Sequence, residues 1–407
     1  MGTKLTESFL KKLIPYIVAS CLALLSAFLL LKLWLADWRI QFFYTGDAMF
    51  YNMMVKGIIE NGWYLYNKNL GMPFGATLYD FPAPDTFTFL LFKFLAIFTS
   101  DQSLIINIFY IATFPLTTIT SLYVLRHFKI SFFPALLSSL LYAFLTYHLS
   151  RAEIHLMYTV YFIVPLIVMV ILWVCAAGSK KDNDEGEQLR LSLKNRKFIS
   201  SLVICALIAS TGGVYYSFFA CFLLVAVGII QASAYRQLRK LLLPGVLTAF
   251  TFLVLVANLS PNIIYQMKNG KTETAQRNPI EAEIYGLKLA QLVLPQTGHR
   301  WITFRRPKAK YNFAPLVNEN DDATLGVIGT IGFMTLLGWL ACNVFNKGRE
   351  ENQTQILLGQ LSVLNITAFL LGTIGGFSVI FALFVSPQIR SYNRISIYIA
   401  FFSLFAV

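Results

Sequence analysis

The sequence predicts an all-α fold, a polytopic bundle of membrane-spanning helices. Of the 407 residues, 57% are hydrophobic and only 13% are charged, and the mean hydropathy is +0.62. Soluble domains carry roughly 25% charged residues, so these values exclude an ordinary soluble protein. The apolar runs are continuous rather than alternating, which favours helices over the strands of a barrel.

The first span is predicted from about Leu13 to Ala36 and follows Lys4, Lys11 and Lys12. This run is too long for the apolar core of a signal peptide and matches the roughly 20 residues that cross a bilayer. We therefore expect an uncleaved anchor with a cytoplasmic N-terminus. Further spans are expected at Ser103–Leu125, Phe133–Tyr147, Leu156–Ala177, Phe198–Thr211, Val214–Gln231, Leu241–Asn262, Thr324–Val344 and Ile356–Gly372, with a shorter run at Phe377–Val385.

A last apolar run begins at Ile395 and is cut off at Val407, which predicts a natural chain that continues. The whole gives about 10 to 11 spans of visible sequence. With no internal repeat, we expect a single membrane domain over residues 1–407.

The basic clusters decide the expected topology. If the short run Phe87–Phe98 lies at the outer interface instead of spanning, four later basic clusters face the cytoplasm, as the positive-inside rule expects. These clusters are Arg126/Lys129, Lys180 to Lys197, Arg236/Arg239/Lys240 and Lys347/Arg349. Two long extracytoplasmic loops with interfacial helices then follow at residues 37–102 and 263–322, and residues 178–197 form a cytoplasmic connector.

Composition also limits the partners. The net charge of +13 is distributed over loops between spans, so we interpret it as topology and expect no nucleic acid. The five cysteines lie in apolar runs without the spacing of a metal or redox motif. The lipid bilayer is the expected environment.

Asp47 is the first candidate site residue. It follows Thr45-Gly46 just outside the first span and precedes an amphipathic run with Met49 and Phe50. An Asp in this position fits a helix N-cap, whose side chain accepts backbone N–H bonds. It also fits a general base at the membrane surface, and the two roles are compatible.

The second candidate is the short outer turn at residues 150–155. Arg151, Glu153 and His155 place three ionisable groups at a membrane boundary, where they must be solvated, paired or functional. One interpretation is an interfacial salt bridge between Arg151 and Glu153. The other is a shared ligand or metal site, because Glu153 and His155 are two residues apart and point the same way on an extended turn.

The third candidate is the second long loop. Its stretch Glu281 to Leu294 has helical periodicity, which predicts an amphipathic helix along the outer membrane surface. Its cations offer phosphate binding, since the guanidinium fork suits phosphate oxygens. The candidates are Arg277, His299 and Arg300, together with Arg390 and Arg394 from a later loop of undetermined side.

The chain resembles the GT-C superfamily in four features taken together. They are the Gly46-Asp47 start of the first outer loop, the segment Gly71-Met72-Pro73-Phe74-Gly75, the short acidic turn with His155 and the second long loop. These are polytopic glycosyltransferases that use polyprenyl-phosphate-linked sugars, and protein O-mannosyltransferases and bacterial YfhO-type membrane proteins belong to or resemble them. The stretches Glu281–Leu289 and Pro295–Arg300 look like those of uncharacterised bacterial members.

The resemblance implies roles for particular residues. Asp47 matches the early Asp that acts as general base or helps to position acceptor and metal, and Glu153 matches a second acidic position. The resemblance places Glu283 and Tyr285 in the stretch similar to other members, and we expect them to bind substrate with Arg151 and the loop cations. Position 45 is Thr and position 49 is Met, so the Asp-x-Asp form of metal-dependent members is missing.

The expected reaction is an inverting transfer of a sugar from a polyprenyl-phosphate carrier to a hydroxyl of a glycan, lipid or protein. Asp47 would accept the proton of that hydroxyl, and Glu153 and His155 would orient the acceptor, steady the leaving phosphate or bind a divalent cation such as Mg²⁺ or Mn²⁺. We expect a bacterial cytoplasmic membrane, with the site facing outside or the periplasm.

Two other classes of function stay open. Glycine pairs within apolar regions, Gly212-Gly213 and Gly375-Gly376, are typical of the broken helices of a transporter or lipid-linked sugar flippase. A transporter, however, carries ionisable residues inside its spans, and here the charges gather at the boundary. A non-catalytic subunit with the same fold is also compatible, because fold does not establish activity.

Overall fold

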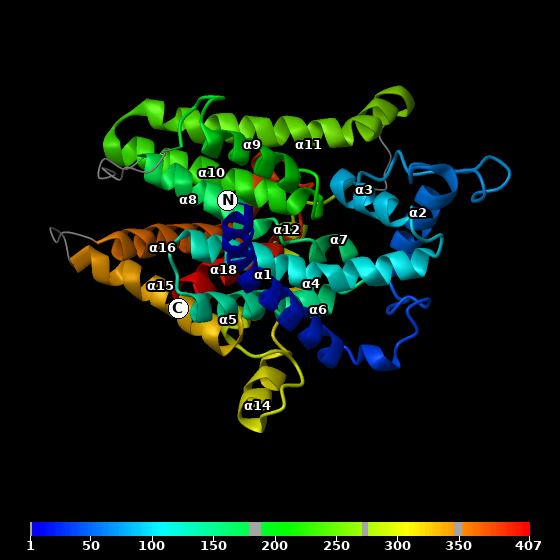
Figure 1. Cartoon of the computed structure of the whole chain (residues 1–407). Coiled ribbons are helices and arrows are strands. Elements are labelled where there is room, and N and C mark those ends of the chain that lie inside the picture. Colours follow the sequence, from blue (N-terminus) through cyan, green and yellow to red (C-terminus); the bar gives the residue numbers. More distant parts are fainter. Residues whose placement is uncertain (1, 179–188, 271–275, 346–351) are drawn as a thin grey trace. The chain divides into compact units, whose positions relative to one another are not determined.

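The computed structural model describes residues 2–178, 189–270, 276–345 and 352–407. Most of these residues are helical, and the strands are two residues long, so the predicted all-α class is confirmed (Figure 1). Part of the predicted connector, residues 179–188, and the predicted basic pair Lys347/Arg349 lie outside the described residues. The chain packs as two compact units.

Unit 1 contains residues 1–78, 87–144 and 151–166. Its elements are α1 (Gly2–Leu30), η1 (Leu33–Leu35), α2 (Ala48–Asn61), β1 (Tyr66–Asn67), β2 (Ala76–Thr77), α3 (Thr86–Leu95), α4 (Gln102–His127), α5 (Phe132–Ala143) and α7 (Leu156–Thr159). The long helix α4 is its centre, because α1, α2 and α5 all pack against it. The Asp101 side chain caps this helix by accepting the Leu104 N–H at 3.0 Å.

A short hairpin in unit 1 contains the Gly71-Met72-Pro73-Phe74-Gly75 segment at its tip. Tyr66 pairs with Thr77 and Asn67 with Ala76 in antiparallel register. Gly71 has φ of +67°, and a Cβ there would lie 2.9 Å from the Gly75 carbonyl oxygen, so the turn requires glycine.

Unit 2 contains residues 79–86, 145–150 and 167–407. Its elements are α8 (Val164–Gly178), α9 (Arg196–Ile208), α10 (Gly213–Tyr235), η2 (Leu238–Leu241), α11 (Leu242–Asn269), α12 (Glu281–Ile284), α13 (Leu289–Val293), α14 (Ile302–Tyr311), η4 (Glu319–Ala323), α15 (Gly326–Phe345), α16 (Gln353–Gly372), α17 (Phe377–Phe384), η5 (Tyr392–Ile395) and α18 (Ser396–Ala406). The helix α6 (Thr146–Arg151) has residues in both units, as do the first turns of α3 and α8.

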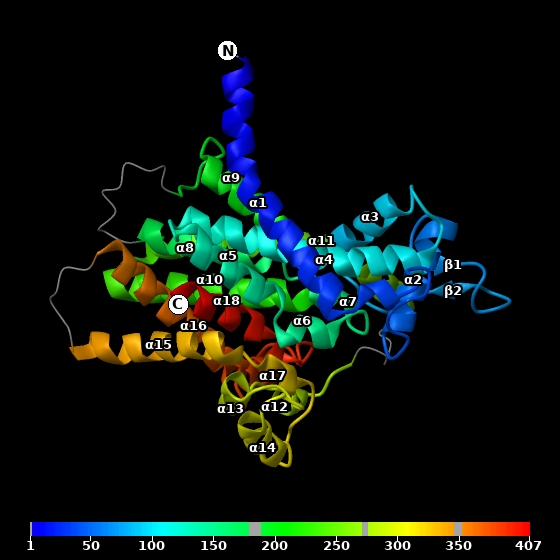
Figure 2. The ribbon, with the colours of Figure 1, turned by 60° about the horizontal axis from the view of Figure 1, so that its bottom comes forward.

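Two groups of helices form the body of unit 2. α9, α10 and α11 pack together, and so do α15, α16 and α18, which run side by side in both views (Figures 1 and 2). α18 is almost fully buried, and its side chains fill the space between α15 and α16. At a close crossing of α15 and α18, a Cβ at Gly332 would lie 2.0 Å from the Ser403 carbonyl oxygen.

Residues 79–86 come from the first long loop but pack in unit 2. The Asn262 amide donates to the carbonyl oxygens of Tyr79 at 2.9 Å and Phe81 at 3.0 Å. Asp85 is buried, and its Oδ1 accepts the backbone N–H of Gly213 at 2.7 Å. Burial raises the pKa of Asp85 to about 7, against the lowering effect of that hydrogen bond.

Seven helices within the described residues are long and apolar enough to cross a membrane: Lys12–Leu30, Gln102–His127, Phe132–Arg151, Gly213–Tyr235, Leu238–Asn269, Gly326–Asn343 and Gln353–Gly372. The predicted multi-pass membrane protein is therefore confirmed, with fewer helices of spanning length than the expected 10 to 11. The runs Thr86–Leu95 and Val164–Gly178 form shorter apolar helices. α17 has only 8 residues, about 12 Å of helix, which is too short to span.

The predicted amphipathic helix from Glu281 to Leu294 is wrong. The chain instead forms the short helices α12 and α13, separated at Leu287. The backbone of Leu287 donates to the Gly372 carbonyl at 2.7 Å and accepts the Ile374 N–H at 3.1 Å, and its side chain is fully buried. These bridges to the end of α16 satisfy the backbone in place of a continuous helix.

Candidate functional site

Asp47 lies at the N-terminus of α2 in unit 1 but does not cap it. The residue occupies the N-cap position, and its side chain makes no capping hydrogen bond. The carboxylate instead lies 3.3 Å from Nδ1 of His155, and 59% of the Asp47 side chain is exposed. The capping interpretation of this side chain is therefore wrong, and the carboxylate faces both an imidazole and solvent.

His155 reaches Asp47 from the turn that follows α6. Ala152 has φ of +39°, and the backbone N–H of His155 donates to the Arg151 carbonyl at 2.9 Å, which closes the turn. Gly46 has φ of +57°, and a Cβ there would lie 3.3 Å from Cγ2 of Ile154. Glycine at position 46 thus permits the close approach that brings Asp47 and His155 together.

Glu153 supports this arrangement from inside the unit. Its side chain is fully buried, and Oε2 accepts the backbone N–H of Phe43 at 3.1 Å. Burial raises the pKa of Glu153 to about 7, while hydrogen bonds from Phe43, Phe42 and the Gln41 side chain act in the opposite direction. Arg151 is buried as well, so neither side chain lies at a solvated surface, and the salt bridge expected between these two residues stays a prediction.

Asn107 of α4 holds the segment that leads to Asp47. Its Nδ2 donates to the carbonyl oxygens of Trp38 at 2.9 Å and Ile40 at 2.8 Å, and its Oδ1 accepts the Phe42 N–H at 3.2 Å. The side chain is fully buried. Sequence reasoning missed this residue, although a lone amide between Ile106 and Ile108 is the kind of intramembrane polar group that indicates a structural or functional contact.

Gln41 connects the same segment to the start of α2. Its Nε2 donates to the Ala48 carbonyl at 3.1 Å, and its Oε1 accepts from Asn52 at 2.9 Å. A cavity of about 550 Å³ borders this segment, and Lys32 and Tyr110 are among its lining residues. Unit 1 thus combines an exposed carboxylate, an imidazole and a cavity with one cation, Lys32, and one acid, Asp37, in its wall.

The predicted metal ligands do not converge as a set. Asp47 and His155 are adjacent, whereas Glu153 is directed to the backbone of Phe43. In the part of the chain that the structure describes, no three His, Cys, Asp or Glu side chains are placed to hold one ion. A cation at this site would take one carboxylate and one imidazole from the protein and its other ligands from substrate or water.

All five predicted phosphate ligands lie in unit 2, and two of them, Arg390 and Arg394, are paired with acidic side chains. Arg390 Nη1 lies 3.0 Å from Glu281 and its guanidinium lies over the Tyr285 ring at 5.1 Å. Arg394 Nη2 lies 3.6 Å from Glu319. Both arginines therefore lie on the same side as the second long loop, and their charges are partly neutralised.

Glu283 and Tyr285 contribute to the same junction. Glu283 accepts the Gly375 N–H at 3.1 Å, and the Tyr285 carbonyl accepts from the backbone and the side chain of Asn393, each at 3.1 Å. These contacts attach the loop after α11 to the segments on both sides of α17. Their role in substrate binding stays a prediction, as does that of Arg277, which is half-buried and acts electrostatically on Glu281.

His299 and Arg300 lie apart from that junction, at the base of α14. His299 accepts the Trp301 N–H at 3.2 Å and packs edge-on against Trp301 and Phe304. Arg300 is exposed. The predicted phosphate cations of unit 2 thus belong to two places, the Arg390/Arg394 junction and the α14 base.

The fold and these contacts define a multi-pass helical membrane protein with a carboxylate–imidazole pair outside its spans. Searches of protein-family models, curated proteins and solved structures found no match for the chain. Its function is therefore argued from the residues themselves.

Proposed function

We propose that the protein is an integral membrane glycosyltransferase of the GT-C type, which transfers a sugar from a polyprenyl-phosphate carrier to an acceptor hydroxyl with inversion. The observation that carries this proposal is the Asp47 carboxylate, which is exposed, makes no capping bond and lies 3.3 Å from His155. A base for hydroxyl deprotonation must be reachable, and the exposure of this carboxylate beside an imidazole supports that role.

In the proposed step, the acceptor oxygen attacks the anomeric carbon while its proton passes to Asp47. The bond between the anomeric carbon and the phosphate oxygen breaks, and its electron pair leaves with the lipid phosphate. His155 Nδ1 lies 3.3 Å from the carboxylate, and we propose that this imidazole orients the base toward the acceptor. Glu153 is fully buried and acts by fixing the backbone at Phe43 rather than by touching the substrate.

The donor is proposed to bind next to this pair. The cavity beside residues 41–43 is of the size of a small ligand site and has Lys32 as well as Asp37 in its wall. A cation there would offset the charge that the phosphate gains as the bond breaks, and an interfacial site strengthens that attraction relative to water. We place the protein in a bacterial cytoplasmic membrane, with the site on the extracytoplasmic face, because this topology puts the basic clusters inside.

The test is transfer of radiolabelled sugar from polyprenyl-phosphate donors to endogenous acceptors, in membranes that contain the full chain. We expect Asp47→Asn to lower transfer by about 100-fold or more, in line with the loss of a general base. His155→Gln is expected to lower transfer less than Asp47→Asn does. The matched control is Asp80→Asn, which changes an acid of the same long loop outside the pair and should leave transfer at the wild-type level.

Wild-type transfer by Asp47→Asn would remove Asp47 as the base. A larger loss with His155→Gln than with Asp47→Asn would make the imidazole the base and the carboxylate its orienting group. Loss in EDTA that Mg²⁺ or Mn²⁺ restores would add a divalent cation. Absence of transfer from every donor would refute the glycosyltransferase and favour a transporter or a non-catalytic subunit.

A further inference from the structure

The helix α14 projects from unit 2 with almost no cover. Figure 2 shows it at the edge of the unit beyond α12 and α13, and every residue from Trp301 to Lys310 except Lys308 is exposed. A ten-residue helix with Pro307 inside has little stability of its own. Its helical form therefore depends on contacts outside the helix itself.

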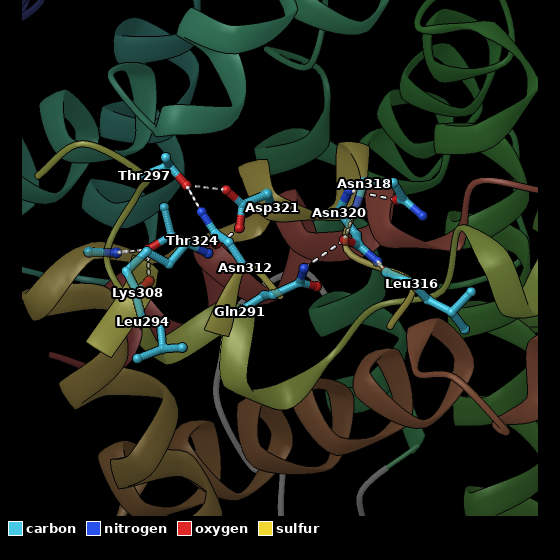
Figure 3. A network of polar contacts seen from close by, with 11 residues as sticks. Gln291, Leu294, Thr297, Lys308, Asn312, Leu316, Asn318, Asn320, Asp321 and Thr324 are labelled. Atoms are coloured by element: carbon cyan, nitrogen blue, oxygen red, sulfur yellow. Dashed lines mark hydrogen bonds and ion pairs between the residues drawn. The ribbon is translucent and has the colours of Figure 1, made fainter. Parts of the chain in front are cut away.

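One buried ion pair attaches this helix. Lys308 is only 1% exposed and pairs with Asp321, which also accepts from the Thr297 hydroxyl at 2.8 Å. Asn312 donates to that same hydroxyl at 3.0 Å, as Figure 3 shows. These contacts fix the base of α14 and leave the rest of its surface available.

The attachment point places α14 next to the membrane boundary. Asp321 lies five residues before Gly326, which is the first residue of the membrane-spanning helix α15. Five residues of extended chain cover at most about 17 Å. In addition, the Leu325 N–H donates to the Leu292 carbonyl at 3.0 Å, which holds this connection close to α13. The base of α14 therefore lies close to the level at which α15 enters the bilayer.

The exposed side chains of α14 and its flanks are of two kinds. Trp301 is 67% exposed and Phe313 is 91% exposed, and Trp301 stacks on Phe304 with ring centroids 5.8 Å apart. The cations are Arg300, Arg305, Arg306 and Lys310, all exposed, and residues 298–313 contain no Asp or Glu. Aromatic rings beside an excess of Arg and Lys are typical of elements that lie in the headgroup region of a bilayer.

We propose that residues 298–313, which we call the α14 anchor, bind the surface of the bilayer by its anionic phospholipid headgroups. Trp301, Phe304 and Phe313 enter the interfacial layer, and the four cations contact lipid phosphates. The Lys308–Asp321 pair neutralises the one cation that points inward, so the remaining positive charge is directed outward. This inference is independent of the glycosyltransferase proposal.

The experiment is hydrogen–deuterium exchange of the full chain in nanodiscs of phosphatidylcholine alone or with phosphatidylglycerol. We expect exchange in residues 298–313 to be about tenfold or more slower in the anionic discs, with α10 unchanged. Each cation near an anionic surface contributes roughly a fivefold preference, so Arg305→Gln with Arg306→Gln should reduce this difference by up to about 25-fold. Arg236→Gln with Arg239→Gln removes two exposed cations elsewhere and should leave it unchanged.

Two results would overturn the proposal. Equal exchange in both kinds of disc would show that the anchor does not recognise anionic lipid. Protection that appears only when a soluble acidic polysaccharide is added would assign the surface to that class of polymer instead. Substitution of Trp301→Ser with Phe304→Ser tests the apolar part, and it should speed exchange of residues 298–313 in both discs without affecting α10.

Discussion

Replacing Asn107 with alanine is expected to loosen the segment that carries Asp47. The substitution removes three hydrogen bonds, two to the carbonyls of Trp38 and Ile40 and one from the Phe42 N–H. A hydrogen bond contributes about 1 kcal/mol net, and the groups left behind gain partial access to water because this segment lies near the surface. We therefore expect a loss of about 1–3 kcal/mol in the free energy that keeps the segment closed.

Hydrogen exchange of the full chain in nanodiscs measures this loss. A change of 1–3 kcal/mol corresponds to about 5- to 150-fold faster exchange in residues 38–43, with α10 unaffected. Thr118→Val is the matched control, because the Thr118 hydroxyl is buried on the same helix but donates only within α4, to the Phe114 carbonyl at 3.0 Å. Exchange of residues 38–43 that stays within twofold of wild type, or that rises equally across the whole chain, would refute the assigned role of Asn107.

Three further predictions concern neighbouring contacts. Because burial raises the pKa of Glu153 from 4.5 to about 7, its ionisation opposes folding, so stability should fall by about 3 kcal/mol as the pH rises from 4.5 through 7. Glu153→Gln should flatten this dependence in thermal unfolding measured in detergent, and an equally steep fall in the variant would contradict the assignment. Gly46→Ala should destabilise the protein by about 1–2 kcal/mol, since φ is +57° and the new Cβ meets Ile154, and an unchanged melting temperature would argue against that conformation. Asp85→Ala should cost about 1–3 kcal/mol by leaving the buried Gly213 N–H without an acceptor, whereas Asp85→Asn retains one and should melt close to wild type; equal losses in the two variants would show that the hydrogen bond is not the cause.

The sequence by itself determined the class of the protein. Continuous apolar runs predict membrane helices because hydrocarbon leaves the backbone no other partners, and seven such helices have the required length. It also singled out Asp47 and His155 as candidates, because ionisable groups at a membrane boundary are costly without a purpose. These signals are local, and each can be read within a few residues.

Only the tertiary structure decided which of these groups meet. The 3.3 Å approach of His155 to Asp47, the burial of Glu153 and the three bonds of Asn107 join segments that are distant in sequence. No periodicity encodes such contacts, since they depend on how α4 packs against the first loop. The same reason explains the failed prediction of a helix from Glu281 to Leu294, where backbone bonds from Leu287 to the end of α16 outweighed a local helical pattern.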